Sequence, residues 1–129
     1  MTEAHEMVTV TTFPAENIRD WRSRDVIDEA GDKIGSLEAI YVDTRNDDPA
    51  FATVEVGIVG RKRLVFVPLA GATVGPDYLR VRSDKKHVKG APSIDTDGEL
   101  LADDEPGLFS YYGLSYPGAT TGQRALARR

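Results

Sequence analysis

Hydrophobic and polar residues alternate along the middle of the chain, and this period of two is typical of half-buried β-strands. In the clearest segment, Ala52, Val54 and Val56 are expected to face the core. Thr53 and Glu55, which lie between them, are expected to face outward. Similar patterns predict strands at residues 26–27, 33–34, 35–43, 51–57, 63–68 and 78–82.

Glycine and proline residues separate these strands at intervals of about 8–12 residues, which is typical of small all-β domains. The run at 63–68 is apolar throughout, so this strand is expected to be covered on both faces. No long helical pattern lies between the strands, which excludes parallel βαβ units. The pattern therefore predicts an all-β fold, either a small antiparallel barrel or a sandwich. Closing the sheet into a barrel would remove its exposed edges.

The hydrophobic period changes after Ser83. Residues 83–90 predict one helical turn, and residues 102–113 predict a short helix that Gly113 ends. Segment 91–116 is too rich in large apolar side chains for a disordered linker, so it is expected to pack on the barrel. The predicted organisation is a flexible leader (1–16), a barrel domain (17–90), a C-terminal extension packed on the barrel (91–116) and a flexible basic tail (117–129). Removing the tail is expected to leave the fold intact.

Composition narrows the class of protein. The chain has 129 residues, 40% of them hydrophobic, which suits one globular domain. The absence of cysteine excludes disulfides, thiolate metal sites and cysteine nucleophiles. Apolar runs are too short for a membrane span, and the N-terminus lacks a secretory signal core, so a cytoplasmic protein is expected. The net charge of −5 argues against non-specific nucleic-acid binding by the whole surface.

The residues that usually carry catalysis or bind metals are scarce. His5 and His87 are the only histidines, and neither belongs to a nucleophile–histidine–carboxylate or paired-histidine pattern. Asp95 begins a segment that superficially resembles a calcium loop. The sixth and twelfth positions of such a loop need Gly and Glu, but they hold Leu100 and Pro106. We therefore expect no catalytic residues, no metal site, no cofactor and no enzymatic activity.

Two groups of residues are candidates for binding a partner. Aliphatic residues on a predicted turn and an apolar stripe on the C-terminal helix indicate contact with another chain. These interface candidates are Ile58, Val59, Leu108, Tyr111 and Tyr112. The second group is the densest basic cluster together with a nearby strand, which would suit phosphate contacts with RNA. Its members are Arg61, Lys62, Arg63, Arg80 and Arg82.

Several separated segments resemble the PRC-barrel family. The first is a turn followed by an alternating strand, matched here by Gly31, Asp32, Lys33, Ile34, Gly35 and Asp43. Further matches are the strand end at 67–72, the segment at 88–92 and the segment at 108–114. The resemblance covers residues 13–116. One departure is Tyr111, where free-standing bacterial members often have histidine.

The resemblance implies a small antiparallel PRC-type β-barrel with a short C-terminal helical extension. Similar domains are the cytoplasmic domain of the photosynthetic reaction-centre H subunit and the C-terminal domain of ribosome maturation factors. Both act by binding and assembly, and the family shares no catalytic residues. The first hypothesis is therefore a non-catalytic protein-interaction module that self-associates as a homodimer or larger, or binds another protein. The alternative is an RNA- or ribosome-associated factor that binds through the basic cluster.

Overall fold

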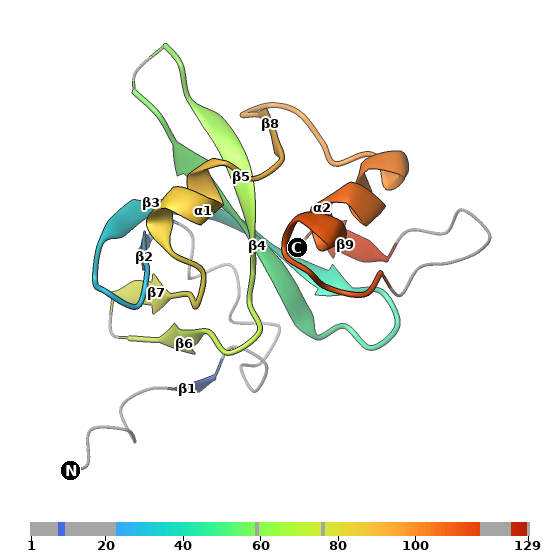
Figure 1. Cartoon of the computed structure of the whole chain (residues 1–129), viewed down its shortest axis with the longest axis horizontal. Helices are drawn as coiled ribbons and strands as arrows, with labels where there is room; N and C mark the ends of the chain where they lie inside the picture. Colours follow the sequence, from blue (N-terminus) through green and yellow to red (C-terminus); the bar gives the residue numbers. More distant parts are fainter. Residues whose placement is uncertain (1–7, 10–22, 59, 76, 117–124, 129) are drawn as a thin grey trace.

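The computed structural model describes residues 8–9, 23–58, 60–75, 77–116 and 125–128. The fold is mostly β and corresponds to a small β-barrel with a short C-terminal helix, as predicted (Figure 1). Its strands are β1 (Val8–Thr9), β2 (Asp25–Ile27), β3 (Lys33–Asp43), β4 (Pro49–Val56), β5 (Arg63–Pro68), β6 (Thr73–Val74), β7 (Tyr78–Arg80), β8 (Ser93–Asp95) and β9 (Leu126–Arg128). Its helices are α1 (Lys85–Lys89), the 3₁₀ helix η4 (Ala102–Asp104) and α2 (Glu105–Tyr111).

The strands form one sheet in the order β1-β6-β7-β2-β3-β4-β5-β8, and β9 pairs separately with β3. Neighbouring strands are antiparallel except β2 and β7, which are parallel. The predicted small antiparallel barrel is thus confirmed in its main features, with one parallel pair that the sequence did not indicate. A parallel pair needs a long connection, and here the chain passes through β3, β4, β5 and β6 before β7 reaches the free edge of β2.

Strand β3 organises the barrel because it is long and interrupted by bulges. It spans 11 residues, and its register against β4 shifts after Leu37 and again after Tyr41. Its first part pairs with β2 and its last part with β9. Gly35 lies where β3 approaches β4 closely, since a Cβ atom there would collide with the carbonyl oxygen of Glu55. The bulges increase the local twist and turn the two ends of β3 toward different neighbours.

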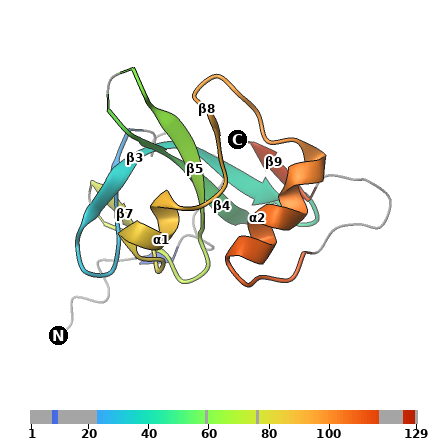
Figure 2. The same ribbon diagram turned by 45° about the horizontal axis from the view of Figure 1, so that its top comes forward.

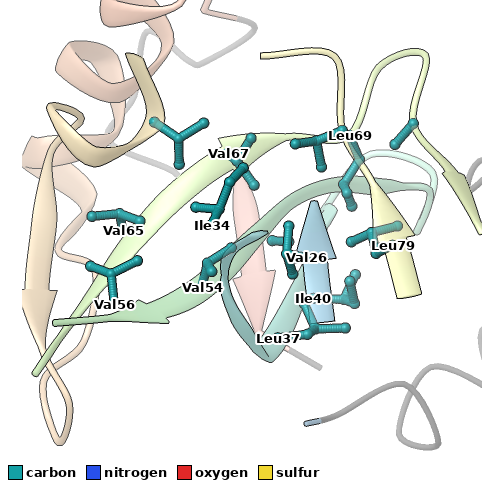
Figure 3. Close-up of a cluster of buried hydrophobic side chains, with 14 of the residues drawn as sticks. Val26, Ile34, Leu37, Ile40, Val54, Val56, Val65, Val67, Leu69 and Leu79 are labelled. Carbon is teal, nitrogen blue, oxygen red and sulfur yellow. The ribbon is translucent and has the colours of Figure 1, made fainter. Parts of the chain in front are cut away.

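Aliphatic side chains fill the inside of the barrel (Figure 3). They come from β2, β3, β4, β5 and β7, and from the segments that follow β5 and β7. The members labelled in the figure are each at most 4% exposed: Val26, Ile34, Leu37, Ile40, Val54, Val56, Val65, Val67, Leu69 and Leu79. The alternation at Ala52, Val54 and Val56 therefore predicted the inward face of β4 correctly.

A second, aromatic core covers the opposite face of β4 and β5. Phe51 of β4 makes a T-shaped contact with Phe109 of α2 at 5.0 Å between ring centroids. Phe66 of β5 makes a T-shaped contact with Tyr41 of β3, with 5.2 Å between ring centroids. Leu108 of α2 lies in this core with no exposed surface. Strand β5 is thus covered on both faces, as the apolar run at 63–68 predicted, and β4 is covered on its second face as well.

Thr53 corrects one expectation. It points away from the aliphatic core, as the alternation predicted, but it is completely buried and not exposed. Its hydroxyl donates a 2.6 Å hydrogen bond to a carboxylate oxygen of Glu38 on β3. The guanidinium of Arg128 on β9 pairs with the other oxygen of Glu38. The period of two correctly predicts the face of β4 to which Thr53 points. Whether Thr53 is buried depends on which other element covers that face.

Strand β9 corrects the expectation that residues 117–129 form a tail outside the fold. Leu126, only 1% exposed, belongs to the aromatic core, and β9 pairs with the end of β3 over three residues. Figure 2 shows β9 beside α2. Because β9 covers part of the aromatic core, we expect its removal to destabilise the fold. Residues 117–124 and 129 lie outside the described residues. Most of the predicted leader (1–16) and the predicted boundary between leader and barrel also lie outside them.

The carboxylate of Glu105 connects α2 to the segments on either side of residues 117–124. Glu105 is completely buried, and its Oε1 atom accepts hydrogen bonds from the Tyr116 hydroxyl at 2.7 Å and from the Ala125 amide at 2.8 Å. The Ala125 amide immediately precedes β9. This carboxylate therefore helps to fix the strand that closes the aromatic core.

We expect Glu105→Ala to lower the free energy of unfolding by about 1–3 kcal/mol, because a buried donor that loses its acceptor costs that much. Glu105→Gln keeps an acceptor oxygen and should lose less. Urea unfolding followed by far-UV circular dichroism measures both variants. Equal stability of wild type and Glu105→Ala would contradict this role.

Candidate functional site

The β4–β5 hairpin ends in an exposed tip that carries an apolar residue between two glycines. Gly57 and Gly60 have φ values of +104° and +87°, which favour glycine, and the Arg61 amide donates a 2.8 Å hydrogen bond to the Ile58 carbonyl. The Ile58 side chain is 72% exposed. Val59 lies outside the described residues. The tip therefore presents Ile58 to solvent with the exposed side chains of Arg61 and Lys62 close behind it.

Lysine residues from three segments line a groove of about 450 Å³ beside this hairpin. The segments are the start of β3, the hairpin and α1, and the lysines are Lys33, Lys62, Lys85 and Lys89. We call this surface the lysine groove. Lys62 pairs with Glu55 at 3.5 Å, and Lys33 pairs with Asp25 at 3.2 Å. The other two, Lys85 and Lys89 of α1, do not lie within 4 Å of a carboxylate oxygen in the part of the chain that the structure describes. The groove thus has positive charge available for an anion.

Two contacts fix α1 against the barrel and so position its lysines. The Arg63 guanidinium donates a 2.7 Å hydrogen bond to the Lys89 carbonyl, which joins the hairpin to the end of α1. At the other end, the carboxylate of Asp28 accepts hydrogen bonds from the amides of Ala30, Asp32 and Lys85 at 2.9–3.0 Å. Asp28 is only 3% exposed. Burial by itself would raise the pKa of Asp28, but these backbone hydrogen bonds outweigh it and lower the pKa below its ordinary value of 3.8.

Arg80 and Arg82 do not join the hairpin basic residues. Neither lines the lysine groove. The Arg80 guanidinium lies over the Tyr78 ring, 5.5 Å from its centroid, and Arg82 pairs with Glu29 at 3.2 Å. Of the five predicted basic residues, only Lys62 lines the lysine groove, and the other four do not. The lysines of β3 and α1 take their place.

The tyrosines of α2 mainly hold the extension against the barrel. Tyr111 stacks on His87 of α1 with 4.5 Å between centroids and donates a 2.7 Å hydrogen bond to the His87 carbonyl. The Tyr112 hydroxyl donates a 2.6 Å hydrogen bond to the Phe66 carbonyl of β5, and burial raises the pKa of Tyr112. Both rings remain partly exposed, whereas Leu108 is completely buried. Of the predicted stripe, only the tyrosines retain surface that a partner can reach.

A hollow of about 390 Å³ lies between α2 and the segment that contains β8. Its floor is formed by buried apolar side chains, including Leu108. Its accessible wall includes Ile94 and Gly107, and exposed Asp103 and Asp104 stand at its rim. We call this the acidic hollow. An apolar base with carboxylates at the rim suits an apolar side chain that has a cation beside it.

Within the described ranges, no three His, Asp or Glu side chains lie close enough together to hold a metal ion. None of the described helices is long and apolar enough to cross a membrane. What the arrangement provides is a basic groove and an exposed apolar tip on one part of the barrel, and an acidic hollow against α2.

Sequence reasoning missed several of these residues. The lysines of α1 follow a visible Lys-Lys-x-x-Lys pattern at 85–89, but nothing local indicated that they face the hairpin. No local pattern singled out Asp28 or Glu105. Their burial follows from α1 and β9, which pack over them from distant parts of the chain.

Comparison with known proteins agrees with this architecture. A family model for the PRC-barrel domain matches residues 14–88, which is more than half of the chain. The match ends within α1, so β8, α2 and β9 lie beyond it. Among curated proteins, no sequence matches the chain.

Asp28 provides a pH-dependent test of how α1 is positioned. Because its pKa is lowered in the folded state, its contribution is complete above the ordinary value of 3.8 and is lost as pH falls through the folded pKa. We expect Asp28→Ala to lose about 1–3 kcal/mol of unfolding free energy at pH 7, since its amide donors lose their acceptor. The difference from wild type should shrink below pH 3.8, as measured by urea unfolding at several pH values. Asp28→Asn retains one acceptor oxygen and serves as the control. A difference that does not change with pH would contradict the assignment.

Proposed function

Because the chain belongs to the PRC-barrel domain family, we propose that it is a non-catalytic module that assembles with further copies of itself. PRC-barrel domains are interaction and assembly modules, and the family is generally non-catalytic. The observation that carries the self-association is the exposed Ile58 at the tip of the β4–β5 hairpin.

The position of Ile58 has no explanation within a single copy. Turns are usually built from Gly, Asn, Asp, Ser or Pro, which satisfy the backbone and are well solvated. Here the glycines already meet the conformational need of the turn, and Ile58 contributes nothing to either core. A large aliphatic side chain at an exposed tip gains free energy only if another surface covers it. The partly exposed tyrosines Tyr111 and Tyr112 offer further contact area.

Self-association is tested by sedimentation velocity over a range of protein concentrations. We expect wild type to form dimers or larger assemblies at micromolar concentration. Ile58→Asp should raise the dissociation constant by at least about 30-fold, the loss expected for a central interface residue. Leu114→Asp is the matched control, because it makes the same kind of change at another exposed aliphatic residue that lies outside the hairpin. A wild-type protein that stays monomeric throughout would overturn the proposal.

The lysine groove favours a second candidate, RNA binding. Its lysines, together with Arg61, would contact phosphates, while the net charge of −5 opposes binding by the remaining surface. Arg80 and Arg82 do not line the groove and are not part of this candidate site.

RNA binding would depend strongly on salt. Four phosphate contacts on a single strand predict a loss of affinity of about 50-fold between roughly 50 and 200 mM salt. Fluorescence anisotropy with a labelled single-stranded RNA measures this change. Lys85→Glu combined with Lys89→Glu should abolish binding, whereas Arg82→Glu should not alter it. The absence of binding at low salt would exclude this candidate.

A further inference from the structure

Gly107 of α2 is a glycine that the fold itself does not require. It lies in the first turn of α2, and glycine is a poorer helix former than almost any other residue. Its φ is outside the positive range, and a Cβ atom at this position would meet no other atom within 4 Å. Neither backbone conformation nor close packing therefore explains the residue. Because Gly107 lines the acidic hollow, a side chain here would occupy the open space of the hollow. The glycine keeps that space free.

The rim of the hollow carries uncompensated negative charge. Asp103 and Asp104 are exposed, and no Lys or Arg of the described ranges lies within ion-pair distance of either. The surrounding segment 91–116 has six carboxylates and no Lys or Arg. Neighbouring carboxylates repel one another, so a cation from another molecule would relieve this repulsion.

The hairpin tip has the complementary features. Ile58 offers an exposed apolar side chain, and Arg61 is held across the same turn by the hydrogen bond between its amide and the Ile58 carbonyl. Lys62, which pairs with Glu55 of the same copy at 3.5 Å, adds a second cation. The tip extends away from the rest of the barrel and from α2 (Figures 1 and 2). Within one copy it therefore does not reach the acidic hollow.

We infer that the hairpin tip of one copy docks into the acidic hollow of a second copy, with Ile58 against the wall formed by Ile94 and Gly107 and with Arg61 and Lys62 beside Asp103 and Asp104. The inference rests on the proposed self-association and specifies its geometry. Because the tip and the hollow are different surfaces, each copy uses both, and the contact is heterologous. Such contacts produce rings when the rotation closes and open chains when it does not.

Other occupants of these surfaces make different predictions. A basic peptide from another protein would fit the hollow but would leave the tip without a role. RNA would suit the basic residues near the tip, but the carboxylates of the hollow would repel its phosphates. Only a second copy uses both surfaces in one contact, and that distinction sets the experiment.

The test uses a tip variant, Ile58→Asp, and two hollow variants, Gly107→Leu and Asp103→Lys. Gly107→Leu fills the hollow without removing any contact, and leucine is a better helix former than glycine, so its melting temperature should not fall. Asp103→Lys reverses the charge at the rim and should weaken self-association by a different mechanism. Each variant alone should raise the dissociation constant of self-association by at least about 30-fold in sedimentation velocity.

Mixing provides the decisive measurement. An equimolar mixture of Ile58→Asp and Gly107→Leu retains one intact hollow and one intact tip, so it should form a one-to-one complex that does not grow further. Ser110→Leu, an exposed position on α2 that does not line the hollow, should assemble like wild type.

The possible failures are distinguishable. If both hollow variants assemble like wild type, the docking geometry is wrong while self-association stands. If the two variants do not complement each other in the mixture, the contact is not head to tail. A wild-type protein that is monomeric at every concentration overturns both the docking geometry and the proposed function.

Discussion

The central constraint in this molecule is that β4 and β5 are covered on both faces. The two strands pair residue by residue from Phe51 with Pro68 to Val56 with Arg63. One face is covered when the sheet curls around the aliphatic core. The other face needs a second layer, which α2 and β9 supply through Leu108, Phe109 and Leu126. Burying apolar surface is the main favourable term in folding, so this second layer belongs to the folded unit although it lies beyond the family match.

The same constraint explains why polar groups are buried near the second layer. Once β9 covers the end of β3, the Ala125 amide and the Tyr116 hydroxyl need an acceptor away from water, and Glu105 supplies it. Thr53 is covered in the same way and donates to Glu38. Each of these groups satisfies a requirement that arises only because distant segments come together.

The candidate binding surfaces lie at the edges of the region where β4 and β5 are covered on both faces. The hairpin between β4 and β5 continues past the covered region and ends in Ile58. Helix α1 is fixed by Asp28 at one end and by Arg63 at the other, so its lysines share a groove with the hairpin. The acidic hollow forms where α2 crosses beside β8. Both charged surfaces are therefore products of the same packing that stabilises the cores.

The sequence by itself determined the positions of β2, β3, β4, β5 and β7, the all-β class, the inward face of β4 and the exposed Ile58 tip, because alternation and turn residues are local signals. The short strands β6 and β8 carry no such signal and were not predicted. Only the tertiary structure decided the parallel pairing of β2 with β7, the strand at 126–128 and the grouping of Lys33 with Lys62, Lys85 and Lys89. It also decided that Thr53 and Glu105 are buried and that Arg80 and Arg82 lie apart from the hairpin. A period of two specifies the face of a strand to which a residue points. Which element covers that face depends on contacts between residues far apart in the chain, and no local pattern records them.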